Sequence, residues 1–311
     1  MVAGFRTPER SAVATLGHKP VFPLGGAVLM VLARDIDPSA SPLDYYSYEL
    51  RRLREEAGLK QAELGAIIFC TGSLIGMVEN GRRVPTRDFS ERLDAALGTG
   101  GVFSRLVGLV LRSQLPTWFQ AFAELEVRAT NISSFQPQLV YGLLQTEAYA
   151  RAVLHAGWGQ NLDEAVAARL ERQRILGRER PPFVWVVLDE AVLHRPFGSH
   201  EIMRGQLDRL LEFQDRREVR IQILPFSAGQ HPATVGAFTV LRFDGDPDVV
   251  YAESYGSAHV KANPETARDC AHRYDHLQAA ALSVEESAAL IARVREERYG
   301  DPHQVDGRAL A

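Results

Sequence analysis

The side chains best suited to chemistry follow two apolar runs in the C-terminal half of the sequence. They are Asp189, Glu190, His194, Arg195 and His231. The apolar runs have the β-branched and alternating patterns of strands. Carboxylates and imidazoles beyond strand ends can exchange protons with a substrate or bind a ligand. They can also be structural, since Asp189 and Arg195 are near enough in sequence to pair across one turn.

Other marks of catalysis are missing around these residues. The sequence has no glycine-rich phosphate loop, nucleophile elbow or metal-binding histidine pair beside them. His272 and His276 lie one helical turn apart, but no third ligand is spaced to join them. We therefore expect no enzyme, no metal and no cofactor. A structural role, a pocket for a small ligand or partner peptide, and a hydrolytic site are the alternatives for this group.

Another pair of charged residues, Arg54 and Glu79, lies within a run of short helical patterns. Leucines at helical spacing open the run, a glycine interrupts it, and a second helical pattern follows. After a turn, residues 72–79 form a third pattern, which Thr71 can cap and the following Asn-Gly pair can close. Two helices joined by a short turn are typical of a helix-turn-helix, whose second helix enters the major groove of DNA.

This stretch resembles the Cro/repressor-like, or Xre-type, helix-turn-helix proteins. The resemblance rests on Leu53-Arg54, Gly58-Leu59, Gln61-Ala62-Glu63-Leu64, Ile75, Glu79-Asn80-Gly81-Arg82-Arg83 and Pro85. It implies that residues 44–113 form an all-α, five-helix, lambda-repressor-like DNA-binding domain. In that family the positions of Arg54 and Glu79 pair and lock the first helix to the recognition helix, through two parallel hydrogen bonds. The alternative is two unrelated surface charges.

Several residues of this region are expected to contact DNA. They are Lys60, Gln61, Thr71, Gly72, Ser73, Met77, Asn80, Arg82 and Arg83. The resemblance assigns Gln61, Asn80 and Arg82 to the phosphate backbone. Lys60 stands where the family usually has a capping Ser or Thr, so half of a capping box is missing. Lys60 can contact a phosphate instead, or be an ordinary solvated lysine.

The surface that faces the bases is expected to contain Thr71, Ser73 and Met77. Gly72 has no side chain, Ser73 is short and Met77 offers only apolar contact, so few bases can be read through hydrogen bonds. We expect specificity to depend also on DNA shape and dimer spacing. Phe69 replaces a glycine that is common in this turn, which indicates a tighter or distorted turn.

Charge limits the strength of this DNA-binding module. From Ser41 to Gly98 it has eight Lys and Arg against nine Asp and Glu, and the whole chain has a net charge of -4. Non-specific DNA affinity comes from neutralised phosphates. We therefore expect weak binding by a monomer, a local patch of Arg82, Arg83 and Arg87, and a homodimer.

Two further helices are expected in this region. Thr86 can cap the fourth, and residues 102–111 form the fifth. The apolar side chains of the fifth helix, among them Phe103, Val107 and Val110, either complete the module or form a dimer face.

The ends of the chain differ from its interior. Residues 1–43 include an apolar stretch that superficially resembles a signal peptide but is too short to span a bilayer comfortably. We interpret this leader as disordered or as an overlong translation start, with a membrane anchor as the alternative, and residues 301–311 as a disordered tail. Cys70 and Cys270 lack metal-ligand spacing, which favours two thiols in a reducing cytoplasm. We expect no membrane partner.

Residues 114–300 have a mixed pattern. Strands are expected at 183–188, 219–224, 237–243 and 249–253, and helices at 143–154, 163–176, 202–214, 264–281 and 284–298. Residues 132–140 are extended, but Pro137 argues against a central place in a sheet. The predicted fold is an α+β domain with a mixed sheet of about four strands and flanking helices.

This second region resembles the large C-terminal domain, without an assigned function, that follows the helix-turn-helix in many actinobacterial regulators. The resemblance rests on Gly142-Leu143-Leu144-Gln145-Thr146, Tyr149-Ala150, Arg169, Arg172-Gln173, Leu188-Asp189-Glu190, Leu193, Arg195, Met203-Arg204, Gln206-Leu207, Ile223-Leu224-Pro225, Gly236 and Phe238. Such regulators are commonly encoded beside a small acidic partner protein, in antitoxin-like or developmental switches.

Together these observations predict a cytoplasmic, dimeric transcription regulator that binds specific sequences of double-stranded DNA. By the resemblance, its C-terminal domain senses a small protein partner or ligand and signals through residues 102–115. The alternatives are an antitoxin-like protein that sequesters its partner and binds DNA weakly, and a C-terminal domain that binds a ligand or catalyses hydrolysis.

Overall fold

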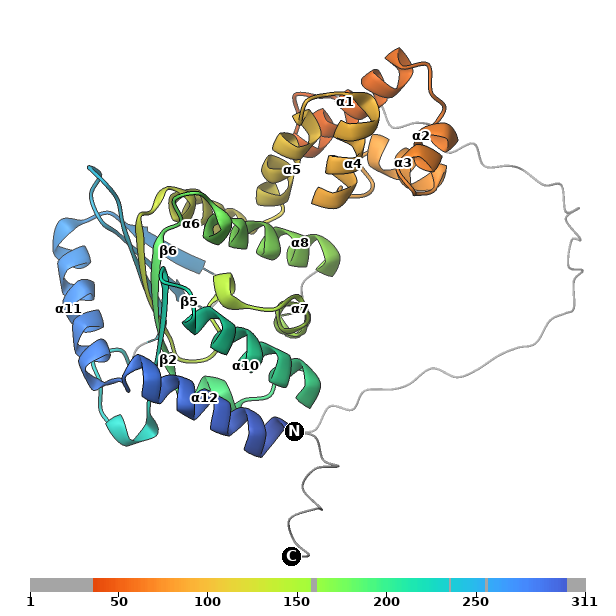
Figure 1. The fold of residues 1–311 in the computed structure, drawn as a ribbon. Helices are drawn as coiled ribbons and strands as arrows, with labels where there is room; N and C mark the ends of the chain where they lie inside the picture. The colour runs from red at the N-terminus through yellow and green to blue at the C-terminus, as the bar shows by residue number, and fades with distance from the viewer. Residues whose placement is uncertain (1–35, 158–160, 235, 255–256, 301–311) are drawn as a thin grey trace, which may run out of the picture. The chain divides into compact units, whose positions relative to one another are not determined.

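The computed structural model describes residues 36–157, 161–234, 236–254 and 257–300. Most of the leader expected at 1–43 and all of the tail expected at 301–311 lie outside these residues. Within them the chain forms a helical region followed by an α+β region (Figure 1).

The helical region contains the expected helix-turn-helix. Its helices are α1 (Pro42–Glu56), α2 (Gln61–Ile67), α3 (Gly72–Glu79), α4 (Arg87–Leu97) and α5 (Val102–Ser113). The hydroxyls of Thr71 and Thr86 cap α3 and α4 as their positions predicted. Helix α1 begins two residues before the expected domain boundary at residue 44, because Ser41 accepts a hydrogen bond from the backbone N–H of Asp44 and Pro42 fits the first turn.

Helix α5 belongs to the interior of the chain. Phe103, Val107 and Val110 have no exposed surface, and α5 packs against α1, α4 and α8. Of the two uses expected for these side chains, a dimer face is therefore wrong. Leu109, on the opposite side of α5, is the large apolar side chain of this helix that remains exposed.

The α+β region contains six described strands. They are β1 (Asn131–Gln136), β2 (Phe183–Asp189), β3 (Val219–Leu224), β4 (Phe238–Arg242), β5 (Val249–Ser254) and β6 (Ser257–Lys261). They form one mixed sheet in the order β3-β2-β1-β4-β5-β6, parallel from β1 to β3 and antiparallel from β1 through β4 and β5 to β6.

The mixed sheet was predicted, but its strand number was too low. Strand β6 was missed because Ser257, His259 and Lys261 alternate with few apolar residues on this edge strand. Strand β1 is central, contrary to the expectation based on Pro137. The proline lies just beyond the last residue of β1, so it removes no hydrogen bond from the ladder.

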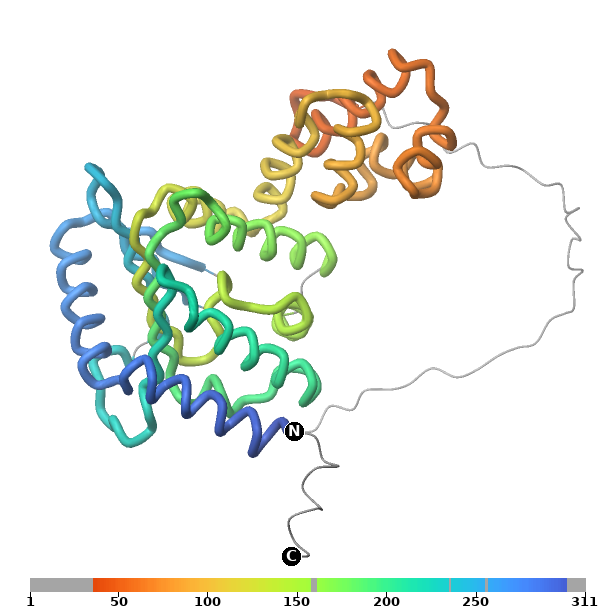
Figure 2. The backbone as a smooth tube through the Cα atoms, viewed as in Figure 1, coloured from red at the N-terminus to blue at the C-terminus, as the bar shows by residue number. Residues whose placement is uncertain are grey.

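Helices cover both faces of this sheet. They are α6 (Thr117–Arg128), α7 (Glu147–Ala156), α8 (Leu162–Gln173), α9 (Ala191–His194), α10 (His200–Gln214), α11 (Pro264–Ala280) and α12 (Val284–Tyr299), with short 3-10 turns η1 (Gly142–Leu144), η2 (Arg174–Gly177) and η3 (Phe226–Ala228). Helix α11 covers one face, where Tyr274 and Leu277 pack on Phe135, Val187 and Val240. The other face is covered mainly by α6, α8, α10 and α12. Figures 1 and 2 show α11 on one side of the sheet and α8 and α10 on the other.

No single helix among the described residues has the length and hydropathy of a membrane span. Helices α2 and α3 meet such a test only as a pair, and they are bent by 113° from each other.

Candidate functional site

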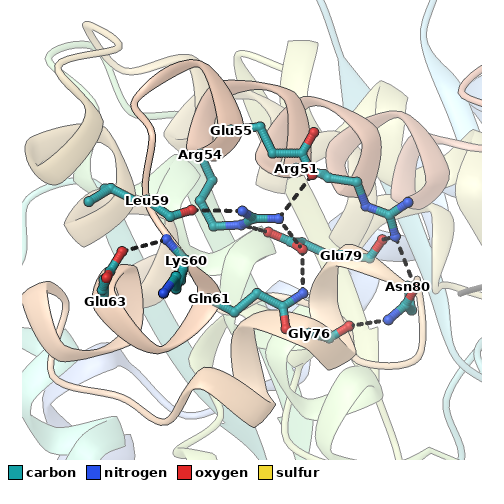
Figure 3. Close-up of polar contacts among 10 residues, drawn as sticks. All are labelled: Arg51, Arg54, Glu55, Leu59, Lys60, Gln61, Glu63, Gly76, Glu79 and Asn80. Carbon is teal, nitrogen blue, oxygen red and sulfur yellow. Dashed lines mark hydrogen bonds and ion pairs between the residues drawn. The ribbon is translucent and has the colours of Figure 1, made fainter. Parts of the chain in front are cut away.

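The recognition helix α3 is attached to α1 by a buried ion pair. Nε of Arg54 donates to Oε1 of Glu79 at 2.5 Å, and Nη2 donates to Oε2 at 3.0 Å (Figure 3). Glu79 has no exposed surface and Arg54 is 8% exposed. Nη1 of Arg54 also donates to the carbonyl of Leu59, which ties the loop before α2 to the same guanidinium. The hydrogen bonds from Arg54 to Glu79 raise the pKa of the guanidinium, so Arg54 stays charged.

Two residues assigned to the DNA backbone have side chains that serve this network. Nε2 of Gln61 donates to Oε2 of Glu79 at 2.7 Å. Asn80 donates to the carbonyl of Gly76 at 2.7 Å and accepts a hydrogen bond from Arg51 at 2.9 Å (Figure 3). The amides of Gln61 and Asn80 therefore hold α3 in place, which leaves mainly their backbone groups for a phosphate.

Helices α2 and α3 cross at two glycines. A Cβ atom on Gly72 would lie 2.8 Å from Cα of Ala62, and one on Gly65 would lie 2.8 Å from the carbonyl oxygen of Cys70. Real Cβ atoms do not come so close to backbone. Gly72 therefore has a packing role besides its place at the start of α3. Sequence reasoning missed Gly65, although its position one turn after Gln61 on α2 was a usable signal.

The outer face of α3 is exposed to solvent. Thr71, Ser73 and Met77 are exposed, with Met77 at 41%. Lys60 and Arg82 are exposed as well. The remaining half of the capping box is present, because the backbone N–H of Lys60 donates to Glu63 at 2.7 Å.

The turn between α2 and α3 contains Phe69 in a left-handed conformation. Its φ is +59°, and its side chain is 86% exposed. Left-handed backbone is costly for residues other than glycine. The turn therefore keeps the shape that a glycine would favour, and the distortion expected from this replacement appears as strain at one residue.

Two arginines of the expected DNA patch contact α8 instead of standing free. Nε of Arg87 donates to Glu171 at 2.8 Å, with a second short hydrogen bond from Nη2, and Arg87 also donates to the carbonyl of Ser104. Arg83 is exposed and lies 3.6 Å from Asp163. The patch predicted from sequence is therefore reduced, because the charge of Arg87 is already neutralised by a carboxylate 84 residues away in the sequence.

The polar group predicted after the strands is only partly brought together. Glu190 lies 3.4 Å from Nε2 of His194 and accepts a hydrogen bond from the backbone of Phe226, on which the imidazole stacks. Asp189 does not pair with Arg195 in the described structure; it accepts a hydrogen bond from the backbone N–H of Ala191. Arg195 is exposed.

His231 lies against the α11 face of the sheet. Its ring meets Phe135 edge to face, and its Nδ1 accepts a hydrogen bond from the backbone of Ala233 at 3.3 Å. Like Asp189 and Glu190, it makes contacts that stabilise the loop in which it lies.

A different polar cluster, which the sequence did not predict, joins α6, α8 and the residue before η1. Nε and Nη2 of Arg172 each donate to Glu126 at 2.8 Å, and the hydroxyl of Tyr141 donates to the same carboxylate at 2.7 Å. All three are nearly inaccessible to solvent. Burial raises the pKa of the Tyr141 hydroxyl well above its ordinary value, and the charge of Glu126 adds to the effect. Tyr141 therefore stays a donor.

The cluster borders a cavity of about 100 Å³ that Phe119, Phe122, Tyr251, Arg169 and Arg172 help to line. Arg172 and Arg169 belong to the set that carried the resemblance of this region, whereas Glu126 and Tyr141 do not. In the sequence, these two arginines were therefore the signal for this part of the domain.

Comparison with known families agrees with the two regions. Residues 47–103 match a model described as a helix-turn-helix domain, a kind of domain that binds DNA. Residues 119–293, more than half of the chain, match a model described as a domain of unknown function, DUF5753. No curated protein and no solved structure shows significant similarity to the chain. The chain therefore belongs to the DUF5753 family and carries a helix-turn-helix domain before the domain that defines it.

Proposed function

We propose that this chain is a transcription regulator that binds specific double-stranded DNA as a homodimer, in the manner of Xre-type repressors. Its α+β region receives a signal and changes the DNA affinity of α3. The observation that carries the proposal is the geometry of α3. Arg54 and Gln61 hold Glu79 at its buried end, while Thr71, Ser73 and Met77 stand exposed on its outer face.

A rigid recognition helix matters in a module with little net positive charge. Binding DNA with a mobile helix would cost ordering entropy in addition to the loss of rotational and translational freedom. The buried network removes that ordering cost before DNA arrives. Specific contacts from two copies can then compensate for weak attraction to phosphates.

Footprinting on the DNA upstream of its own coding sequence tests the proposal. A dimer should protect two half-sites whose centres lie about one helical turn, or a multiple of it, apart. Absence of protected half-sites at every salt concentration tried would sink the proposal.

The salt dependence of DNA affinity tests whether Arg82 and Arg83 contact phosphates. Arg82→Ala with Arg83→Ala should weaken binding to all sequences alike and reduce the slope of log K against log salt by roughly 1 to 2. Arg293→Ala with Arg298→Ala, which removes two arginines from the exposed side of α12, is the charge-matched control and should leave the slope unchanged. A smaller slope in the control would mean that net charge, not α3, attracts DNA.

A second function is favoured by the charge of the helical region. Eight basic against nine acidic residues from Ser41 to Gly98, with Arg87 already paired, leave little attraction for phosphates. In this alternative the chain sequesters a small acidic partner protein and binds DNA only weakly. Failure of the unmodified chain to retain DNA, together with capture of the acidic protein encoded beside it, would favour sequestration over regulation.

Helix α8 is the element proposed to transmit the signal. It contacts α5, and its Glu171 pairs with Arg87 at the start of α4. A small shift of α8 would therefore act on α4 and α5, which pack against the rest of the helical region. The resemblance to regulators that are encoded beside a small acidic protein supports such a protein, bound through its acidic groups, as the signal.

A further inference from the structure

Among the residues that the structure describes, no carboxylate pairs with the guanidinium of Arg169. Within the described residues it forms one hydrogen bond, from Nη1 to Oε1 of Gln145 at 2.8 Å, and no ion pair. Its neighbour Arg172, in contrast, is paired with a carboxylate, because it donates two hydrogen bonds to Glu126. Burial, and then the nearby charge of Arg172, lower the pKa of Arg169 to about 10. A half-buried cation is costly unless an anion pairs with it.

The surroundings of Arg169 hold it toward the cavity. Gln145, which is 2% exposed, accepts from Arg169 and donates its own amide hydrogen to the carbonyl of Val140 at 2.7 Å. Gly142 lies beside the two arginines, where a Cβ atom would be 3.3 Å from Nη1 of Arg172 and 3.4 Å from Cδ of Arg169. The absence of a side chain at this position leaves room for both guanidinium groups.

The lining of the cavity is partly aromatic and partly polar. Phe119, Phe122 and Tyr251 line it together with Arg169 and Arg172, and the rings of Phe122 and Tyr251 stack with their centroids 3.9 Å apart. Exposed Glu253 also lines the cavity, and it accepts a hydrogen bond from the hydroxyl of Tyr251. A volume of about 100 Å³ admits a carboxylate and the first atoms of the stem that carries it.

The position in the sheet is also suited to a ligand. Gln136 at the end of β1 and Glu253 near the end of β5 both line the cavity, so it opens at the carboxyl edge of these strands. The cavity lies beside β1. The strands β2 and β3 follow on one side of β1, and the chain then crosses to β4 on the other side of β1. In open sheets ligands bind at this kind of edge, where the strand order changes direction.

Residues far apart in the sequence meet here. Gly142, Gln145, Arg169 and Arg172 belong to the set on which the resemblance of this region rests. Gln173, from the same set, donates to the carbonyls of Gly142 and Gln145 at 3.0 and 2.8 Å. The set therefore builds one wall of a cavity and presents to it Arg169, a cation that no described carboxylate pairs with.

We propose that this cavity is the signal-binding site of the α+β region and that it takes a carboxylate on a short apolar or aromatic stem, with Arg169 as its partner. The role of this ligand as a signal rests on the proposed function, but binding of the ligand does not require DNA. A guanidinium binds a carboxylate through two parallel hydrogen bonds, and Phe119, Phe122 and Tyr251 accommodate the stem. The carboxylate belongs either to a free organic acid or to the C-terminus of a polypeptide.

The site connects directly to the helical region. Helix α8 carries Arg169 and Arg172 toward the cavity and Glu171 toward Arg87. An anion at Arg169 would add an attraction that this guanidinium lacks among the described residues, which changes its preferred position on α8 without a change of fold. Because both contacts come from one helix, the two sites are coupled through a rigid element.

Calorimetry on the full chain without DNA tests the binding. The probes are benzoate against benzamide, which differ in the carboxylate, and the peptide Gly-Ser-Gly-Phe with a free against an amidated C-terminus. We expect benzoate or the free peptide to bind with a dissociation constant below about 10 mM, and the neutral analogues to bind at least about tenfold more weakly. Hydrogen exchange should slow in residues 139–145 and in α8 when the acid binds.

Substitutions at Arg169 test whether this side chain binds the carboxylate. Arg169→Gln should weaken binding about 10- to 100-fold, while Arg169→Lys, which keeps the charge but loses the fork, should retain part of the affinity. Arg293→Gln, the same change at an exposed position of α12, is the matched control and should bind like the unmodified chain. If Arg169→Gln does not fold, the Lys variant and the exchange pattern still locate the site.

Each outcome decides the matter. Binding of benzoate supports a free acid, and binding of the free peptide alone supports a polypeptide terminus. Equal binding of acid and amide, full affinity in Arg169→Gln, or no binding of any probe up to about 10 mM overturns the proposal. A chain that binds the acid but leaves no footprint on DNA keeps this site and loses the proposed function, so the two failures are distinguishable.

Discussion

At the scale of single residues, Arg54 and Glu79 determine how α3 is held. Glu79 has no contact with solvent, and its two oxygens receive hydrogen bonds from Arg54 and Gln61 (Figure 3). Removing one partner of a buried ion pair leaves an uncompensated charge, which costs more than the pair itself contributes. The pair is thus a device for fixing geometry.

Replacement of Glu79 tests this interpretation. Glu79→Ala should lower the stability of the α1–α3 packing by roughly 3 to 5 kcal/mol, since Arg54 is left unpaired in the interior. Hydrogen exchange of the α3 amides measures the change. The exposed pair of Arg52 with Glu56 provides the control, because Glu56→Ala should cost less than about 0.5 kcal/mol. Equal effects of the two changes would contradict the buried role of Glu79.

At the scale of elements, Asp94 joins α4 to α5. It lies in the last turn of α4, where a negative charge is unfavourable to that helix, yet it accepts hydrogen bonds from the backbone N–H groups of Phe103 and Ser104 at 2.8 Å each. It also accepts from the hydroxyls of Ser104 and Thr99. Gly101 precedes α5 and has no side chain to cap it, so the cap comes from the preceding helix.

This cap has a predictable pH dependence. Burial raises the pKa of Asp94, but the hydrogen bonds from Ser104, Thr99 and Phe103 together outweigh it, and the net pKa lies below its ordinary value of 3.8. Its contribution to stability is therefore complete above that unfolded value and is lost as pH falls through the lower folded pKa. Asp94→Asn should cost about 1 to 2 kcal/mol near pH 7 and much less near pH 3, measured by urea unfolding.

The matched control for Asp94 is Glu91→Gln on the exposed side of α4. It removes the same charge from the same helix without removing a cap, so we expect a change within about 0.5 kcal/mol at both pH values. A pH-independent cost of Asp94→Asn would show that the amide loses packing and not charge-assisted hydrogen bonds.

At the scale of the whole molecule, the charge of the helical region depends on the α+β region. Arg87 and Arg83 are basic residues of the helical region, but their carboxylate partners, Glu171 and Asp163, lie on α8. The arginines available to DNA are thus fewer than the sequence of the helical region suggests. The remainder of the chain sets how strongly this region attracts phosphates.

The salt dependence of DNA binding distinguishes a paired from a free arginine. Arg87→Met should leave the slope of log K against log salt nearly unchanged, because Glu171 already neutralises this guanidinium. Glu171→Gln should free Arg87 and steepen the slope by up to about 1. A slope reduced by Arg87→Met as much as by Arg82→Ala would place Arg87 on the DNA backbone and contradict the pairing as the state that binds DNA.

The sequence by itself determined the features that depend on neighbours in the chain. Helix caps at Thr71 and Thr86, the helix-turn-helix and most strands follow from spacing and local hydrogen bonding, which act over one or two turns. One prediction failed for an equally local reason. Pro137 argues against a central place in the sheet only if it lies inside the strand, and the strand end at Gln136 cannot be located from composition.

Only the tertiary structure decided which distant groups meet. Arg87 lies 84 residues from Glu171, and Arg172 lies 46 from Glu126, so no periodicity relates the partners. Arg169 and Arg172 share one helix and one residue type, yet within the described ranges only Arg172 is bound by a carboxylate. A charge pair depends on desolvation and on atomic distance, and both are fixed by how helices and strands pack after they form. The cation that remains unpaired is therefore visible only in the folded chain.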